Sequence, residues 1–532
     1  TQSKRHPGST AKPLFDYGPG FEYNNYSTYT LFNDEPWEYS DGKEIGNWDG
    51  AYQGLITLRH ALSVSRNIPA LKAFQEVDKK DIIEFVTKLG IEVEESGGSI
   101  HEAHAIGGFN PGASPLQMAA AYAAFANGGY YAEPYSVTKI EYRSDGEVVE
   151  FKSEKERAMS DSTAYLMNNV LQYAVEHGFN GGARVPGSTV AAKTGTSNLD
   201  DDTIERLGLP SGAVNDLWTV AYTPEYSVAL WYGYETVTSE NYLSGASAPK
   251  DAVMASIMKY IPKTTKQFEM PDTVVQSQVE FGTWPAQLPS EHTPSDLIRT
   301  EYFKKGTQPT EVSDRFATLN DVTNLSTNTS GRSITLSWDF KVPEVTTEEY
   351  LKKYFSQSVF GNGTNSFVQQ RLNYNNNTLG GLGFGIYQKN ADGSLDLIAF
   401  TQDTTYTYNP PYSSTSRQVT LVVKAQYSKF VASASKGVET QVTIGAGGTI
   451  PSNPDDEGLN IEMETTTVTP QVGKYEEEGI TITYNGEDVT NKSVITYTLT
   501  NNGTDTTYHS ESELENAVNA LPSGTYVIKY DV

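Results

Sequence analysis

Three short motifs hold the residues of this chain that are best able to do chemistry. They are Ser9-Thr10-Ala11-Lys12 (S-x-x-K), Ser65-Arg66-Asn67 (S-x-N) and Lys193-Thr194-Gly195-Thr196 (K-T-G-T), in that order. A serine hydroxyl needs a base to become a nucleophile, and a neutral lysine amine can act as that base. Together the motifs predict a serine acyl-transfer site that uses lysine rather than histidine as its proton carrier.

The first motif places Ser9 and Lys12 three residues apart, on one face of a helix that we expect to begin near Gly8. A lysine is neutral only when it is buried or lies beside another positive charge, and Lys193 is the candidate for that charge. The helix N-terminus favours the negative charge that develops on the attacking oxygen. We expect Ser9 to be the nucleophile and Lys12 its base. The alternative is a capping serine followed by a solvated lysine.

The second motif lies in a helical stretch that we expect to break at Ile68-Pro69, because the residue before a proline tends to leave the α region. Such a break would turn Ser65 and Asn67 into a cleft. Ser65 is then expected to relay a proton toward the leaving group, and Asn67 to hold the substrate amide and Lys12 by hydrogen bonds. The alternative is two ordinary polar residues at a helix end.

The third motif reads as the end of a strand that begins with small apolar residues at Val190. Gly195 permits close approach of another backbone, so a peptide could add along this edge as an extra strand. Lys193, Thr194 and Thr196 would bind a terminal carboxylate. The backbone N–H groups of Ser9 and Thr196 would form an oxyanion hole. The alternative is a tight strand with a surface lysine.

Residues 1–262 read as a mixed α/β (α+β) domain in which an antiparallel sheet is flanked by helices. The periodicity predicts helices over residues 56–77, 80–89, 115–125, 162–177 and 251–260, and strands over 189–194, 218–222 and 226–234. A tight turn at Thr223-Pro224-Glu225 joins the last two strands. We expect this domain to carry all three motifs.

The rest of the chain is predicted to be a connector and two β-rich modules. Residues 263–312 show little periodicity and form the connector, and residues 446–458 form a linker. Residues 313–445 alternate as half-buried strands and resemble a fibronectin type III sandwich, apart from a helical insertion over 346–357 and an Asn-rich loop at 373–377. Residues 459–532 form a small β-rich module that resembles bacterial immunoglobulin-like domains, with a helix that starts near a Ser512 cap.

Composition excludes several classes of function. The 532 residues carry a formal charge of −27, so a general electrostatic footprint for nucleic acid is absent. Cysteine is absent, which excludes disulfides and thiolate metal sites. The pair His101 and His104 lacks a third nearby ligand, and the G-x-G spacing at 380–385 lacks a βαβ unit, so we predict neither a metal nor a nucleotide cofactor. No run of about 18 apolar residues or signal peptide is seen.

Residues 1–262 resemble the transpeptidase domain of class A penicillin-binding proteins, the bifunctional peptidoglycan synthases. Beyond the three motifs, the resemblance rests on five segments of the chain: Arg5–Ser9, Gly54–Leu58, Met118–Tyr122, Ala126–Gly129 and Lys193–Asn198. It implies a D,D-transpeptidase in which Ser9 attacks the D-Ala-D-Ala bond of a peptidoglycan stem peptide. The acyl group then passes to an amine of a neighbouring stem. It also implies slow-deacylating inhibition by β-lactams.

Family members carry a glycosyltransferase domain and further strands before the nucleophile, whereas this sequence begins eight residues before Ser9. We therefore expect an upstream fragment of the same protein as a partner, and anchoring by that segment at the extracytoplasmic face of a bacterial membrane. Two alternatives stay open. The first is a hydrolase of the same fold, either a D,D-carboxypeptidase or a slow β-lactamase. The second is a non-catalytic penicillin-sensing or wall-binding protein.

Overall fold

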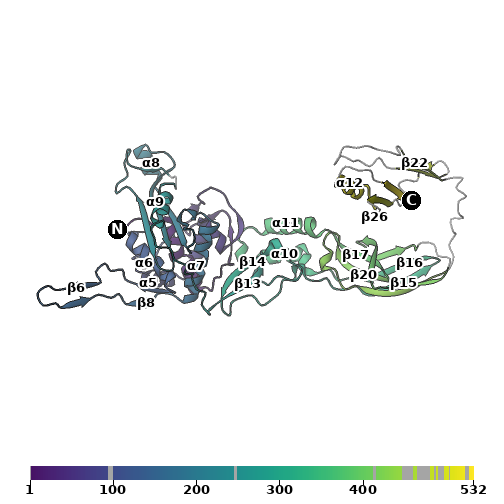
Figure 1. Ribbon diagram of the computed structural model, residues 1–532, viewed down its shortest axis with the longest axis horizontal. Coiled ribbons are helices and arrows are strands. Elements are labelled where there is room, and N and C mark those ends of the chain that lie inside the picture. Colours follow the sequence, from purple (N-terminus) through teal and green to yellow (C-terminus); the bar gives the residue numbers. More distant parts are fainter. Residues whose placement is uncertain are drawn as a thin grey trace.

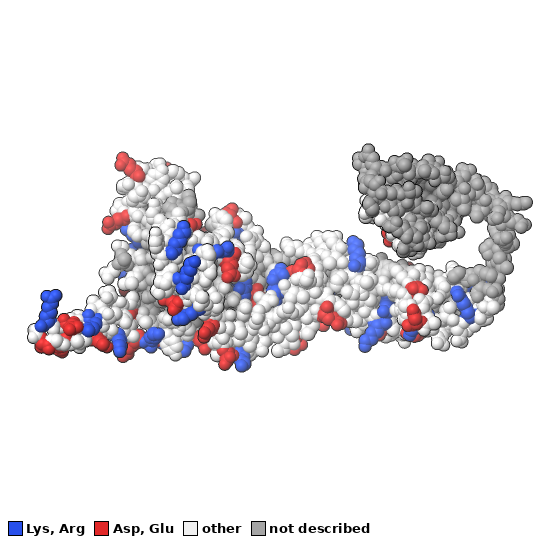
Figure 2. All heavy atoms as spheres, viewed as in Figure 1, with Lys and Arg blue, Asp and Glu red and all other residues white. Residues whose placement is uncertain are grey.

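A computed structural model describes residues 2–93, 100–244, 248–410 and 415–445, together with short segments between 459 and 531. The described chain is elongated, with a mixed helical and stranded unit at the N-terminal end and β-strands toward the C-terminal end (Figure 1). In the part of the chain that the structure describes, no helix has the length and apolar character needed to cross a membrane. Acidic and basic side chains are interspersed on the face seen in Figure 2.

The sheet of the N-terminal unit is antiparallel. Strand β10 (Ala213–Tyr222) pairs with β9 (Ala191–Asn198) on one side, and with β11 (Ser227–Gly233) and β12 (Leu243–Ser244) on the other. The predicted turn between β10 and β11 is confirmed by a hydrogen bond from the Thr223 N–H to the Tyr226 carbonyl. Strand β9 is therefore an edge strand of the described sheet.

Helices cover both faces of this sheet. Ala191, Trp218 and Val220 belong to the largest apolar core, which is built with the helices α1 (Lys12–Phe15), α2 (Tyr17–Tyr23), α3 (Leu58–Ser63), α4 (Asn67–Glu76), α5 (Lys79–Lys88), α6 (Pro115–Ala126) and α7 (Asp161–Glu176). On the opposite face, Ala192 and Ala221 pack with Met254 of α9 (Ala248–Met258). Because side chains alternate along β9, Lys193 faces the first core whereas Thr194 and Thr196 share the α9 face.

The predicted break in the second motif lies three residues earlier than expected. Helix α3 ends at Ser63, the chain turns through Val64 to Arg66, and α4 begins at Asn67. Pro69 falls in the first turn of α4, where a missing N–H costs no helical hydrogen bond. The turn instead depends on Ser65, which adopts a positive φ of 57°.

The stretch expected as a connector contains two long antiparallel strands, β13 (Val274–Glu280) and β14 (Ile298–Lys304). They lie against the strand pair β1 (Leu31–Asp34) and β4 (Gly54–Thr57) through one shared apolar cluster. An ion pair of 2.8 Å between Arg59 and Glu301 and a hydrogen bond from Tyr29 to the Glu280 carbonyl strengthen this contact. The stretch therefore packs on the N-terminal unit along its length.

Two sheets enclose one core between residues 316 and 444. Their strand orders are β15-β16-β19 and β18-β17-β20-β21, and the strands span Thr323–Ser330, Ser333–Asp339, Leu382–Lys389, Leu395–Thr401, Thr405–Tyr408, Arg417–Tyr427 and Val438–Ile444. The helical insertion is present as α10 (Glu348–Phe355) and α11 (Thr364–Tyr374). The predicted loop at 373–377 is wrong, because α11 runs on into a π-helical turn at Asn375–Leu379.

The insertion also contacts the N-terminal unit. The Asn33 side-chain amide donates to the Phe360 carbonyl at 2.8 Å, and the Asn362 N–H donates to the Glu35 carboxylate at 3.1 Å. Leu55 of β4 packs against the apolar cluster of α10 and α11. Helix α11 itself packs in this cluster through Phe367 and Val368, and such tertiary packing can override the weak helix propensity of the Asn-rich run that follows.

Beyond residue 459 the described segments form two small sheets and a helix. The strand orders are β22-β23-β24 and β26-β25-β27, over Leu459–Met463, Ile480–Tyr484, Glu487–Asp488, Thr496–Asn501, Thr504–Tyr508 and Val527–Asp531. Helix α12 (Glu511–Asn519) is capped by Ser510 rather than by the predicted Ser512, because the Ser510 side chain accepts the Glu513 N–H. The predicted linker at 446–458 lies outside the described residues.

Candidate active site

The nucleophile motif forms a 3₁₀ turn, η1 (Gly8–Ala11), that leads directly into α1. Gly8 has a φ of +54°, and a Cβ there would lie 2.4 Å from the Thr196 carbonyl oxygen. Gly195 is equally close to η1, since its Cβ would lie 2.3 Å from the Pro7 carbonyl oxygen. The two glycines therefore let the Ser9 turn press against β9, at a separation that side chains would prevent.

Lys12 is fully buried, and its ammonium nitrogen is held by the second motif. Nζ donates to the backbone carbonyls of Ser65 and Arg66 at 2.8 and 3.0 Å and to Asn67 Oδ1 at 2.8 Å. The pKa of Lys12 is lowered to about 7, chiefly by burial; the buried Asp16 opposes this shift, and the nearby Arg66 charge contributes to it. A near-neutral pKa allows Lys12 to act as a general base.

Ser65 connects the two motif lysines. Its Oγ accepts a hydrogen bond of 2.8 Å from Lys193 Nζ and lies 3.4 Å from Lys12 Nζ. Burial, followed by the charges of Lys12 and Lys250, lowers the pKa of Lys193 well below its usual range. The hydroxyl is thus placed to pass a proton between two amines whose pKa values are both depressed.

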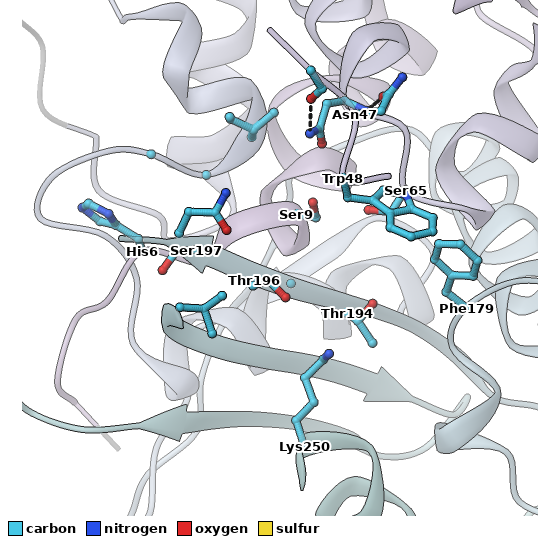
Figure 3. Close-up of a pocket in the computed structure, with 18 of the residues that line it drawn as sticks. His6, Ser9, Asn47, Trp48, Ser65, Phe179, Thr194, Thr196, Ser197 and Lys250 are labelled. Carbon is cyan, nitrogen blue, oxygen red and sulfur yellow. Dashed lines mark hydrogen bonds between the residues drawn. The ribbon is translucent and has the colours of Figure 1, made fainter. Parts of the chain in front are cut away.

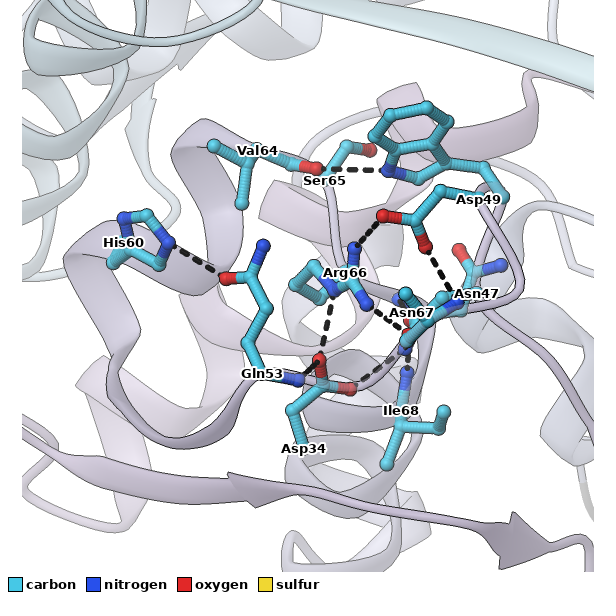
Figure 4. A network of polar contacts seen from close by, with 12 residues as sticks. Asp34, Asn47, Asp49, Gln53, His60, Val64, Ser65, Arg66, Asn67 and Ile68 are labelled. Carbon is cyan, nitrogen blue, oxygen red and sulfur yellow. Dashed lines mark hydrogen bonds and ion pairs between the residues drawn. The ribbon is translucent and has the colours of Figure 1, made fainter.

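A polar network fixes the S-x-N turn (Figure 4). The buried Arg66 guanidinium pairs with Asp34 at 2.9 Å and Asp49 at 2.8 Å, and it also donates to the Ala51 carbonyl. Asn47 accepts the Asn67 N–H at 2.8 Å and donates to Asp34 at 2.7 Å. This network holds the positive φ of Ser65, which is costly for a residue with a side chain.

The free edge of β9 is partly occupied by Asn180, a residue that the sequence motifs do not reveal. Its amide accepts the Thr194 N–H at 3.1 Å and donates to the Ala192 carbonyl at 2.8 Å. Since alternate backbone groups point to the same side of a strand, the Thr196 N–H also points away from β10. It is therefore directed to the open side, where an oxyanion donor is needed.

All eight predicted site residues lie around one region of the fold. Ser9, Ser65, Asn67, Thr194, Gly195 and Thr196 line a cleft of about 930 Å³, and Lys12 and Lys193 lie directly behind it. In Figure 3, Ser9 and Ser65 face this cleft from one side and Thr194 and Thr196 from the other. The convergence depends on chain segments more than 120 residues apart in the sequence, such as Lys193 and Ser65.

The rim of the cleft contains residues that sequence reasoning missed. Trp48 and Phe179 meet edge-to-face at 5.1 Å, both with exposed rings, and the Trp48 indole donates to the Val64 carbonyl. Lys250 and Asp251 of α9 complete the wall beside Thr194. Within the described residues no group of three or more His, Cys, Asp or Glu side chains is arranged to hold a metal ion.

Two family models match adjacent parts of the chain. The penicillin binding protein transpeptidase domain matches residues 1–259, and the C-terminal domain of penicillin-binding protein 1A matches residues 270–318. The chain contains the transpeptidase region of a class A penicillin-binding protein. The resemblance drawn from the three motifs is thus confirmed, and the strand pair β13–β14 lies in the segment that matches the C-terminal domain of penicillin-binding protein 1A.

Curated relatives agree with this assignment. Penicillin-binding protein 1A/1B of Bacillus subtilis is 43% identical over 353 residues, which cover 64% of this chain and 38% of the relative. Penicillin-binding protein 1A of Streptococcus oralis is 42% identical, over 44% of this chain and 37% of the relative. The chain therefore spans less than two-fifths of the length of these relatives. A solved penicillin-binding protein 1A from Haemophilus influenzae is 21% identical, with a TM-score of 0.47 over 59% of this chain and 50% of that one.

Proposed function

We propose that the transpeptidase domain is a serine D,D-transpeptidase that cross-links peptidoglycan stem peptides. The observation that carries the proposal is the Ser65 hydroxyl, which is shared by two buried lysines in the cleft that Ser9 lines. A Lys–Ser–Lys arrangement can take a proton from one hydroxyl and deliver it to a leaving amine without histidine.

In the first step, neutral Lys12 accepts the Ser9 proton as Oγ attacks the carbonyl carbon of the penultimate D-Ala. The Ser9 and Thr196 N–H groups stabilise the oxyanion. The C–N bond to the terminal D-Ala then breaks, and Ser65 passes a proton to the departing amine. In the second step an amine of a neighbouring stem attacks the acyl-enzyme, which forms the cross-link and releases Ser9. Asn67 holds the substrate amide.

Thr194, Gly195 and Thr196 would bind the substrate along the edge of β9, with the threonine hydroxyls at its terminal carboxylate. The same contacts would accept β-lactams, which would acylate Ser9 in place of the stem peptide. We further propose that the whole protein also has glycosyltransferase activity. In this proposal it acts at the extracytoplasmic face of a bacterial membrane, held there by an upstream segment of the same protein.

We also propose that residues 313–445 are a fibronectin type III-like module and residues 459–532 an immunoglobulin-like one. The three-plus-four strand arrangement around Trp338 and Phe384 supports the first assignment. The domain limits of 1–262 and 263–312 belong to the same proposal, with the second segment docked on the first.

Product analysis with a D-Ala-D-Ala pentapeptide tests the reaction. We expect the wild type to release D-Ala and, when an amine acceptor is added, to form a cross-linked product. Both products should be lost in Ser9→Ala. If D-Ala is released and the tetrapeptide is the only other product at every acceptor concentration, the enzyme is a carboxypeptidase. Rapid turnover of penicillin would identify a β-lactamase, and an unreactive Ser9 would leave a sensing or wall-binding role.

A further inference from the structure

Lys250 is a third lysine in the wall of the cleft, and the motif chemistry does not use it. It lies near the start of α9, is 3% exposed, and lines the cleft with Thr194 and Thr196. Figure 3 shows its side chain directed from α9 toward these two threonines. The register of β9 explains why Lys250 lies near these threonines, since Thr194 and Thr196 share the sheet face that α9 covers.

Among the described residues, no hydrogen bond or ion pair engages the Lys250 ammonium. Lys12 and Lys193 differ from it in this respect, since each has at least two acceptors within 3.0 Å. Its sequence neighbour Asp251 also lines the cleft and acts on Lys250 through its charge, but among the described residues no ion pair within 4.0 Å joins the two side chains. A buried ammonium without a partner is costly, and an anion in the cleft would remove that cost.

The chemistry of the wall selects the kind of anion. One ammonium and two threonine hydroxyls supply a single positive charge with short, directional donors, which suits a carboxylate. The hydroxyls lie on the strand whose Thr196 N–H faces the oxyanion position, so a carboxylate one residue beyond the scissile carbonyl falls within their reach.

We propose that Lys250 is a specificity-determining residue that recognises the free C-terminal carboxylate of the substrate, and the ring carboxylate of β-lactams, together with Thr194 and Thr196. The proposal rests on the proposed function, because it places the leaving D-Ala beside α9. Stem peptides whose last carboxylate is amidated or extended should therefore react more slowly with Ser9.

The test compares a penicillin carrying a free carboxylate with its methyl ester, using second-order rates of Ser9 acylation. Lys250→Met should slow acylation by the carboxylate about 10- to 100-fold, as expected for loss of a charged hydrogen bond, and leave the ester rate unchanged. Lys250→Arg should retain most of the preference. Lys259→Met removes an exposed lysine just after α9 and should behave as the wild type.

An unchanged carboxylate-to-ester ratio in Lys250→Met, or an equal loss for both compounds, would overturn the proposal. Thermal melting of each variant separates loss of fold from loss of recognition. Failure of the proposed function would give a different result, because the wild type would then show no Ser9-dependent labelling.

A binding experiment tests recognition without any chemistry. It measures the affinity of Ser9→Ala and of Ser9→Ala/Lys250→Met for a peptide ending in D-Ala-D-Ala and for its C-terminal amide. Equal affinities of the two variants for the carboxylate peptide would contradict the proposal.

Discussion

Acylation of Ser9 should rise with pH through a midpoint near 7. Lys12 takes the serine proton only in its neutral form, and burial lowers the pKa of Lys12 to about 7. The sign follows directly: below the pKa the amine is protonated and acylation is slow, and above it the amine is neutral and acylation is fast. The experiment therefore varies the pH from 6 to 9 and follows the acylation rate.

The depressed pKa also fixes the shape of the curve. With a pKa of about 7, the neutral fraction of Lys12 is roughly 10% at pH 6 and roughly 90% at pH 8, so the rate rises about ninefold and then levels off. With the ordinary value of 10.5, the neutral fraction would be roughly 0.03% at pH 7 and would keep rising about tenfold per pH unit through pH 9.

Stopped-flow or quenched labelling with a fluorescent penicillin gives the second-order acylation rate at each pH. Tryptophan fluorescence without ligand verifies the fold across the series. Lys12→Arg is the matched control, because a guanidinium stays protonated and should give almost no acylation at any of these pH values. A wild-type rate that climbs tenfold per unit to pH 9, or that is flat from pH 6 to 8, would refute the assignment of Lys12 as the base.

Three further substitutions test other parts of the site. Lys193→Ala should slow acylation by several orders of magnitude, because it removes the donor to Ser65 Oγ and a positive charge behind the cleft; near-normal penicillin labelling would rule out this role. Gly8→Ala should slow labelling at least about tenfold, since its Cβ would meet the Thr196 carbonyl, whereas Gly42→Ala, also at positive φ but in open space, should label normally. Arg66→Met should lower the free energy of unfolding by about 3–5 kcal/mol, because it leaves the buried Asp34 carboxylate without its cation; a urea-unfolding change under 1 kcal/mol would be inconsistent with the network.

The site residues could be predicted from the sequence because their types and short spacings are tied to one kind of chemistry. Ser9 and Lys12 share a turn, and Ser65 and Asn67 flank another, so local spacing already orients each pair. The sequence did not reveal where the helix before the S-x-N turn ends. The positive φ of Ser65 depends on a distant network around Asp34 that no local pattern reports.

Site residues that are placed only by tertiary packing could not be predicted from the sequence. Asn180 acts on the edge of β9 from the loop after α7, and Lys250 reaches the cleft because α9 covers one face of the sheet. Neither residue belongs to a motif. Strands β13 and β14 were missed for a similar reason, since their mixed polarity reflects contacts such as Glu301 with Arg59 rather than a regular alternation.

Peptide mapping by mass spectrometry after reaction with penicillin determines whether the hydroxyl of Ser9 is the nucleophile. We expect one covalent adduct per chain, located on Ser9 and absent from the Ser9→Ala variant, which should otherwise fold as the wild type does. An adduct on another residue, or equal labelling of Ser9→Ala, would contradict this expectation.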